Sequence, residues 1–228
     1  MTYPAHFWEL ILGTAIGLLP IINPFAAAPV FLAITEGDSE PRRRQQAFMG
    51  CVYMVLILIS FLVGGSFIMS FFGISIPGIR VAGGLMVAGI GLGMLKPPRN
   101  TLESEQEREA ARAKRDISFT PLAMPQLSGP GSIAVTVGFT SLATHWVDYV
   151  AISIGILVVA LISYVTLRLS SSIVKIIGVN GMSAVTKIMG FLLLCVGVQF
   201  VVNGVLAIAT DPVLLRGIRD ALAPAAVG

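Results

Sequence analysis

Long apolar stretches alternate with short segments that carry most of the charged residues of this chain. The pattern predicts six membrane spans: Phe7–Thr35, Gln45–Phe72, Ile79–Leu95, Ile117–Thr140, Trp146–Leu167 and Met182–Ile208. A helix of about 17 to 25 apolar residues crosses the hydrocarbon core of a bilayer, and each stretch is at least this long. We therefore expect an all-α membrane protein with six transmembrane helices.

Composition excludes a water-soluble domain. Of the 228 residues, 55% are hydrophobic and only 12% are charged, whereas soluble domains carry about 25% charged residues. The net charge of +3 arises from basic residues in short loops, where charge sets membrane orientation, so we expect no nucleic-acid partner. The two cysteines, Cys51 and Cys195, fall inside apolar spans and are expected to be buried as small hydrophobic residues.

The chemistry of an enzyme is missing from the sequence. No nucleophile–base arrangement, phosphate-binding loop or metal-ligand spacing occurs, so we expect neither catalysis nor a bound metal or cofactor. The amino terminus lacks the basic region of a cleavable signal peptide, so the first apolar stretch is expected to remain as a span.

Lysine and arginine are divided unequally between the two sets of alternate loops. Twelve lie on one side: Arg42, Arg43, Arg44, Lys96, Arg99, Arg108, Arg112, Lys114, Arg115, Arg168, Lys175 and Lys187. Three lie on the other: Arg80, Arg216 and Arg219. The positive-inside rule then places the first set in the cytoplasm and both termini outside it.

The chain divides into two similar halves. We expect a first transmembrane repeat at residues 1–95, a charged cytoplasmic linker at 96–116, a second repeat at 117–210 and a tail at 211–228. Arg80–Gly83 matches Lys187–Gly190 at an offset of 107. Asn23-Pro24 matches Gly129-Pro130 at an offset of 106. Because each half holds three spans, the second must enter the membrane from the opposite side, which predicts two inverted three-helix repeats.

The first span of each half is interrupted by prolines. These are Pro20, Pro24 and Pro29 in the first half and Pro121, Pro125 and Pro130 in the second. An interior proline removes a hydrogen bond and costs a helix about 3 kcal/mol, so we expect each span to be divided into two helices. Asn23-Pro24 has the sequence of an N-cap and first helical residue, and Ser128-Gly129-Pro130 offers the same chemistry.

Two helices that start inside the membrane predict a central substrate site. Their free N–H groups and positive dipole ends favour an anionic group such as a carboxylate. The candidate substrate-binding residues are Asn23, Pro24, Gln126, Ser128, Gly129, Pro130 and Ser132. Arg80 and Lys187 are candidates for gating or orientation, with snorkelling to the membrane interface as the alternative.

Acidic residues are absent from the middle of every predicted span. This argues against a carboxylate proton relay and favours a small neutral or zwitterionic solute. Asp148 and Glu9 lie near the outer ends of their spans and are expected to be solvated. Two alternatives stay open: the prolines only kink packed helices, or each interrupted span is a re-entrant hairpin that leaves the amino terminus in the cytoplasm.

Several motifs resemble the MarC family of bacterial inner-membrane proteins, in particular the branch named for multiple antibiotic resistance. They are Asn23–Leu32, Phe72–Leu85, Pro121–Pro125 with Gly129–Gly131, and Met189–Leu193 with Gly197–Phe200. The resemblance covers nearly the whole chain and implies a six-span inner-membrane protein, in a family where some members are described as transporters of small neutral amino acids. Some relatives carry Asp where this chain has Asn23, and this departure removes the candidate ionisable group from the first break.

We therefore predict a transporter that moves a small polar solute, such as a neutral amino acid, by alternating access around the interrupted spans. Its expected partners are the lipid bilayer and this solute, and a homo-oligomer is compatible with the sequence. The alternatives are a non-transporting membrane scaffold or stress-related accessory protein, and drug efflux, which the family name suggests.

The charge asymmetry leads to a test of topology. Cysteines introduced into Glu36–Arg44, Lys96–Asp116 and Leu169–Gly178 should be shielded from impermeant thiol reagents added to intact cells, because these segments carry the cytoplasmic charge. Labelling is measured before and after permeabilisation, in a background without Cys51 and Cys195. Labelling of the central linker in intact cells would contradict the orientation.

Overall fold

The computed structural model describes residues 3–96, 116–140, 143, 145–212 and 215–216, and within them all regular structure is helical. In chain order the helices are α1 (Tyr3–Ile22), α2 (Pro24–Ile34), α3 (Glu40–Phe72), α4 (Ile76–Leu95), η1 (Ser118–Leu127), α6 (Pro130–Phe139), α7 (Trp146–Arg168) and α8 (Ser170–Ala209). Nearly all of the predicted linker and most of the predicted tail lie outside the described residues.

Five helices in the described part of the chain are long and apolar enough to cross a membrane. Their spanning segments are Ala5–Ile22, Glu40–Phe72, Ile76–Leu95, Trp146–Arg168 and Gly181–Ala209. The predicted fourth span is instead occupied by η1 and α6, each of ten residues. The prediction of a helical membrane protein is therefore confirmed for these residues, whereas the predicted fourth span is not a single long helix.

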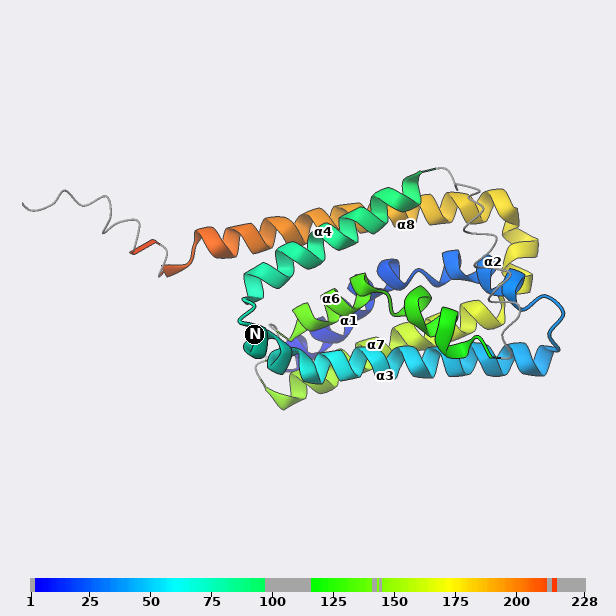
Figure 1. The fold of residues 1–228 in the computed structure, drawn as a ribbon, viewed down its shortest axis with the longest axis horizontal. Helices are drawn as coiled ribbons and strands as arrows, with labels where there is room; N and C mark the ends of the chain where they lie inside the picture. Colours follow the sequence, from blue (N-terminus) through cyan, green and yellow to red (C-terminus); the bar gives the residue numbers. More distant parts are fainter. Residues whose placement is uncertain (1–2, 97–115, 141–142, 144, 213–214, 217–228) are drawn as a thin grey trace, which may run out of the picture.

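The helices run side by side along the long axis of the molecule (Figure 1). In this view α4 and most of α8 form one layer, α3 lies at the opposite side, and α1, α2, α6 and α7 lie between. α1 begins at the end marked N, and α2 continues from it toward the other end. The first break therefore does not reverse the chain, unlike a re-entrant hairpin.

α8 differs most from its predicted boundaries. It starts at Ser170, twelve residues before the predicted Met182, and is divided at Gly178 (φ 69, ψ 169). Glycine takes such positive φ values without the steric cost that a Cβ would bring. The first part of α8 consequently turns away from the long second part that lies beside α4 (Figure 1). Cys195 is exposed on this second part, so the expectation that both cysteines are buried holds only for Cys51.

Glycines allow the backbones of α4 and α8 to touch. A Cβ built at Gly197 would lie 2.6 Å from the carbonyl oxygen of Gly84, and one at Gly91 would lie 2.6 Å from that of Gly190. The two glycines on each helix are seven residues apart and so share one face, and their pairing order makes the helices antiparallel. Because lipid provides no hydrophobic driving force between helices, this close packing is what stabilises the pair.

The glycine contact predicts opposite effects of two alanine substitutions. Gly197→Ala should lower the melting temperature, since its Cβ would overlap the backbone of α4, at a cost of about 1–3 kcal/mol. Gly89→Ala meets nothing within 4 Å and should leave stability equal or raised by up to about 1 kcal/mol. Fluorescence-detected size-exclusion after heating measures both. Equal melting temperatures would show that α4 and α8 do not touch in this way.

Candidate functional site

The first break lies between α1 and α2, at Asn23. This residue has left-handed backbone angles (φ 41, ψ 67), and its Oδ1 accepts a 3.2 Å hydrogen bond from the N–H of Ala26. The N–H of Ala27 donates to the Asn23 carbonyl oxygen at 3.2 Å, while Pro24 has no N–H. Within the described residues, this leaves the N–H of Phe25 without an acceptor. The predicted cap is confirmed. With this cap, the first turn of α2 has few N–H groups left to bind another molecule.

The second break lies between η1 and α6. Thr120 (φ −127, ψ 121) and Met124 (φ −129, ψ 123) are extended, because a following proline disfavours the helical region. Gly129 is the N-cap of α6, which begins at Pro130. The prediction that Ser128 caps this helix is wrong, since the N-cap is Gly129 and the Ser128 hydroxyl has no hydrogen-bond partner among the described residues. The N–H of Ser128 donates back into η1 at 2.7 Å.

The first turn of α6 keeps donors available. Pro130 has no N–H, and the N–H of Ile133 donates to the Gly129 carbonyl oxygen at 3.1 Å. In the part of the chain that the structure describes, the N–H groups of Gly131 and Ser132 have no acceptor. Both residues are buried. Because helix N-termini carry partial positive charge, this turn suits an anionic group better than the start of α2 does.

Buried hydroxyl groups line the same helix. Ser128, Ser132 and Thr136 are spaced four residues apart and are at most 1% exposed. The Ser132 hydroxyl donates to the Gly129 carbonyl oxygen at 2.9 Å. The hydroxyls of Ser128 and Thr136, and that of Thr14 on α1, have no hydrogen-bond partner among the described residues. A buried polar atom without a partner costs about 1–3 kcal/mol and calls for a function or a bound molecule.

The two breaks approach each other beside α4. The Nδ2 of Asn23 lies 3.9 Å from the sulfur of Met94. A Cβ built at Gly131 would lie 2.8 Å from the Cδ1 of Ile90 and 3.5 Å from the Cγ2 of Ile21. The start of α6 therefore packs near the end of α1, and α4 covers both. This arrangement brings together candidate residues from both halves of the sequence.

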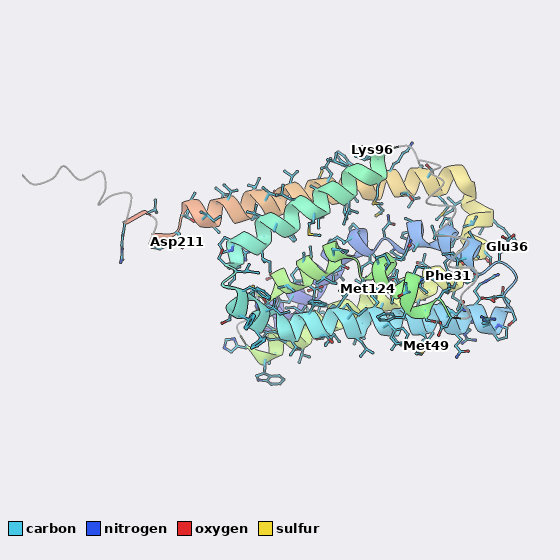
Figure 2. The ribbon with its side chains drawn as sticks, in the orientation of Figure 1. Phe31, Glu36, Met49, Lys96, Met124 and Asp211 are labelled. Carbon is cyan, nitrogen blue, oxygen red and sulfur yellow. The ribbon has the colours of Figure 1, made fainter. Side chains whose placement is uncertain are left out.

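Access differs between the two breaks. Asn23 is 5% exposed, whereas Pro125 and Pro130 at the second break are exposed. Figure 2 shows Met124 lying between the ends marked by Glu36 and Asp211. Gln126 faces a pocket of about 10 Å³ between α2 and η1, which holds no more than about one water molecule. In this conformation the polar side chains of Asn23, Ser128 and Ser132 are buried, while the prolines of the second break face outward.

Arg80 and Lys187 have different surroundings despite their matched positions in the sequence. Arg80 lines a pocket of about 250 Å³ between α4, α6 and α8, to which Asn203 contributes a second polar side chain. This volume is below the roughly 300–1,000 Å³ of sites for drug-sized ligands, so it suits a small solute. Lys187 is exposed on α8. Arg80 is therefore placed at a pocket that a small solute could enter.

The structure corrects one expectation about charge. Asp148 is 2% exposed rather than solvated. Its Oδ2 accepts a 2.9 Å hydrogen bond from the N–H of His145, and its Oδ1 lies 3.8 Å from the Nε2 of His6. The side chain therefore fixes the start of α7 against α1. Its spacing of three residues from His145 is that of a capping box, which is the signal that could have predicted this role.

Comparison with known proteins gives a consistent family. The family described as "MarC family integral membrane protein" matches residues 8–209. Inner membrane protein MarC of Salmonella typhimurium is 41% identical over 202 residues, which cover 84% of this chain and 91% of that protein. The proteins of the same name from Citrobacter koseri and Escherichia coli O1:K1 are each 40% identical with the same coverage. No solved structure matches.

The cap at Asn23 predicts a graded response to substitution. Asn23→Ala removes the Oδ1 acceptor and places a Cβ without compensation in the left-handed region, so stability should fall by about 1–3 kcal/mol. Asn23→Gly loses the same acceptor but tolerates the backbone angles, and should cost only a few tenths of a kcal/mol. Melting temperatures in detergent measure both. A glycine variant as unstable as the alanine variant would contradict the assigned backbone conformation.

Proposed function

The chain belongs to the MarC family of integral membrane proteins, and on that premise we propose that it transports a small neutral or zwitterionic solute across the bacterial inner membrane by alternating access. Small neutral amino acids are the solute class that we favour. The positive end of α6 would stabilise the carboxylate of such a solute. The neutral hydroxyls nearby would form hydrogen bonds with the other polar groups of the solute. Solute and bilayer are the partners that this function requires.

We also propose that the chain crosses the membrane six times as two inverted repeats. Three observations support this topology. The N-caps of α2 and α6, Asn23 and Gly129, are 106 residues apart, within one residue of the offset of 107 between Arg80–Gly83 and Lys187–Gly190. α2 continues in the direction of α1 (Figure 1). The last helix of each half, α4 and α8, packs antiparallel through glycines, as a pseudo-two-fold axis in the membrane plane requires.

The observation that carries the proposed function is the polar end of α6. Two buried N–H groups, of Gly131 and Ser132, and the unpartnered hydroxyl of Ser128 lie within five consecutive residues at the second break. Such a set costs stability unless a bound molecule uses it, and a carboxylate accepts from all three donors. Interrupted helices with free N-termini near the bilayer midplane are typical of substrate sites in secondary transporters.

Opening of the site would follow from movement at the breaks. The pocket beside Gln126 is closed at about 10 Å³, whereas the pocket beside Arg80 has about 250 Å³. α6 lines the Arg80 pocket through Ala134, Val135 and Gly138, so the polar end of this helix and the pocket share one element. We infer that a shift of α6 relative to α4 connects them, with Arg80 attracting the carboxylate on its way.

A nearly isosteric substitution separates transport from folding. Ser128→Ala removes a hydroxyl that has no partner in the described protein, so stability should be unchanged or rise by up to about 1–3 kcal/mol. If this hydroxyl binds solute, uptake into proteoliposomes should nevertheless fall about tenfold, the equivalent of one lost hydrogen bond to a charged group. Radiolabelled glycine and alanine are the first solutes to test, with and without ion gradients.

Ser163→Ala is the matched control. Ser163 on α7 is also fully buried with an unpartnered hydroxyl, but it lies outside the breaks. Its substitution should leave uptake unchanged and, as for Ser128→Ala, leave stability unchanged or raised. Normal transport by Ser128→Ala would remove this hydroxyl from the site. Equal uptake of glycine and glycinamide would argue against a carboxylate site, and selective export of bulky cationic drugs would favour efflux.

A further inference from the structure

A large pocket at one end of the molecule lies far from the breaks in sequence and is not used by the proposed transport. It has a volume of about 730 Å³ and is formed by the first turns of α3, the end of α7 and the start of α8. Its charged lining residues are Glu40, Arg43, Arg44 and Arg168. Three guanidinium groups against one carboxylate give the pocket a net positive charge.

The arginines are not equally available. Arg43 donates to Glu40 Oε1 at 3.1 Å and to the carbonyl oxygen of Thr35 at 3.3 Å, which neutralises the one carboxylate in the pocket. Arg44 and Arg168 are exposed and have no acidic partner in the described part of the chain. The Nε of Arg44 donates to the hydroxyl oxygen of Tyr164 at 3.2 Å. This contact orients its terminal NH groups and leaves the hydroxyl proton of Tyr164 free to donate.

An apolar groove continues from this pocket along the outer surface of α3 and α7. It has about 280 Å³ and is lined by Phe48, Cys51, Val52, Val55, Leu56, Leu157, Ala160, Leu161 and Tyr164. Phe48 and Tyr164 line both the pocket and the groove, and their rings stack edge to face at 5.9 Å. The basic pocket and the apolar groove therefore meet at this aromatic pair, at the end of the membrane-spanning helices.

From this juxtaposition we propose that the two spaces form one binding site for an anionic phospholipid. The phosphodiester lies between Arg44 and Arg168 with Tyr164 donating to it, and one acyl chain lies in the groove between α3 and α7. A guanidinium binds the phosphodiester with two parallel hydrogen bonds. The net positive charge of the pocket favours a headgroup with net negative charge, because the ammonium of a zwitterionic headgroup would be repelled by the arginines. The groove selects a lipid over a free phosphate, since it runs along the helices as an acyl chain does. The orientation proposed above places this lipid in the cytoplasmic leaflet.

Native mass spectrometry of the purified full-length protein tests the site. It is titrated with dioleoyl phosphatidylglycerol and with dioleoyl phosphatidylcholine, which share acyl chains but differ in net charge. The anionic lipid should bind more tightly, and each arginine lost should weaken it about fivefold. Arg44→Gln with Arg168→Gln should therefore reduce affinity roughly 25-fold and abolish the preference. Lys187→Gln, which removes an exposed cation on α8 outside the pocket, is the control and should have no effect.

The groove is tested separately. Leu161→Trp fills it from α7, where this side chain is 63% exposed, and should weaken binding of both lipids by at least severalfold. Leu85→Trp, at a 61% exposed position on α4 outside the groove, is the matched control. Melting temperatures verify that each variant is folded.

Three results would overturn the proposal. They are equal binding of the two lipids by the unmodified protein, displacement of the lipid by glycerol 3-phosphate as effective as by phosphatidylglycerol itself, and unchanged lipid binding by Leu161→Trp. The second result would mean a site for a soluble phosphate compound. Loss of a dimer rather than of lipid in Leu161→Trp would mean that a second copy of the chain covers the groove. None of these measurements involves transport, so their failure leaves the proposed function unaffected.

Discussion

The structure depends on one constraint: backbone polar groups in hydrocarbon must find partners within the protein. The simplest solution is a continuous helix, which prolines interrupt in two predicted spans. Polar groups at the interrupted ends then form hydrogen bonds with residues nearby in the chain. Asn23 caps α2 with its side chain, and Ser128 closes η1 with its N–H. The N–H donors that these contacts leave free lie mainly at the start of α6, where the two halves meet. The candidate site is therefore a consequence of how the breaks are accommodated.

Close packing through small residues holds together the helix pair α4 and α8 beside the breaks. α4 and α8 touch through glycines, and α4 at the same time covers both breaks through Ile90 and Met94. Because lipid offers no hydrophobic advantage for helix association, shape complementarity must supply the stability. A helix pair held in this way can act as a fixed frame, against which α6 would move in the proposed transport.

The ends of the molecule have a different chemistry from its middle. Arg44, Arg168 and Tyr164 gather at one end, while Asp148 and His145 cap α7 at the other. Charged groups at the ends can be stabilised by water or by helix ends, whereas the buried candidates Asn23, Ser128 and Ser132 are neutral. In the proposed function, a small solute would then be recognised by backbone N–H groups and neutral hydroxyls at the start of α6.

The sequence by itself determined the helical class, most span positions and both breaks, because hydrophobic length and the missing N–H of proline act within a few residues. It also identified the cap at Asn23, which needs only the backbone three residues ahead. The tertiary structure decided which polar groups are left over. Gly129 rather than Ser128 caps α6, Asp148 is buried, and Arg80 and Lys187 differ in exposure. Arg44 meets Tyr164 across 120 residues. Such outcomes depend on which helices become neighbours, and a local sequence pattern does not specify those neighbours.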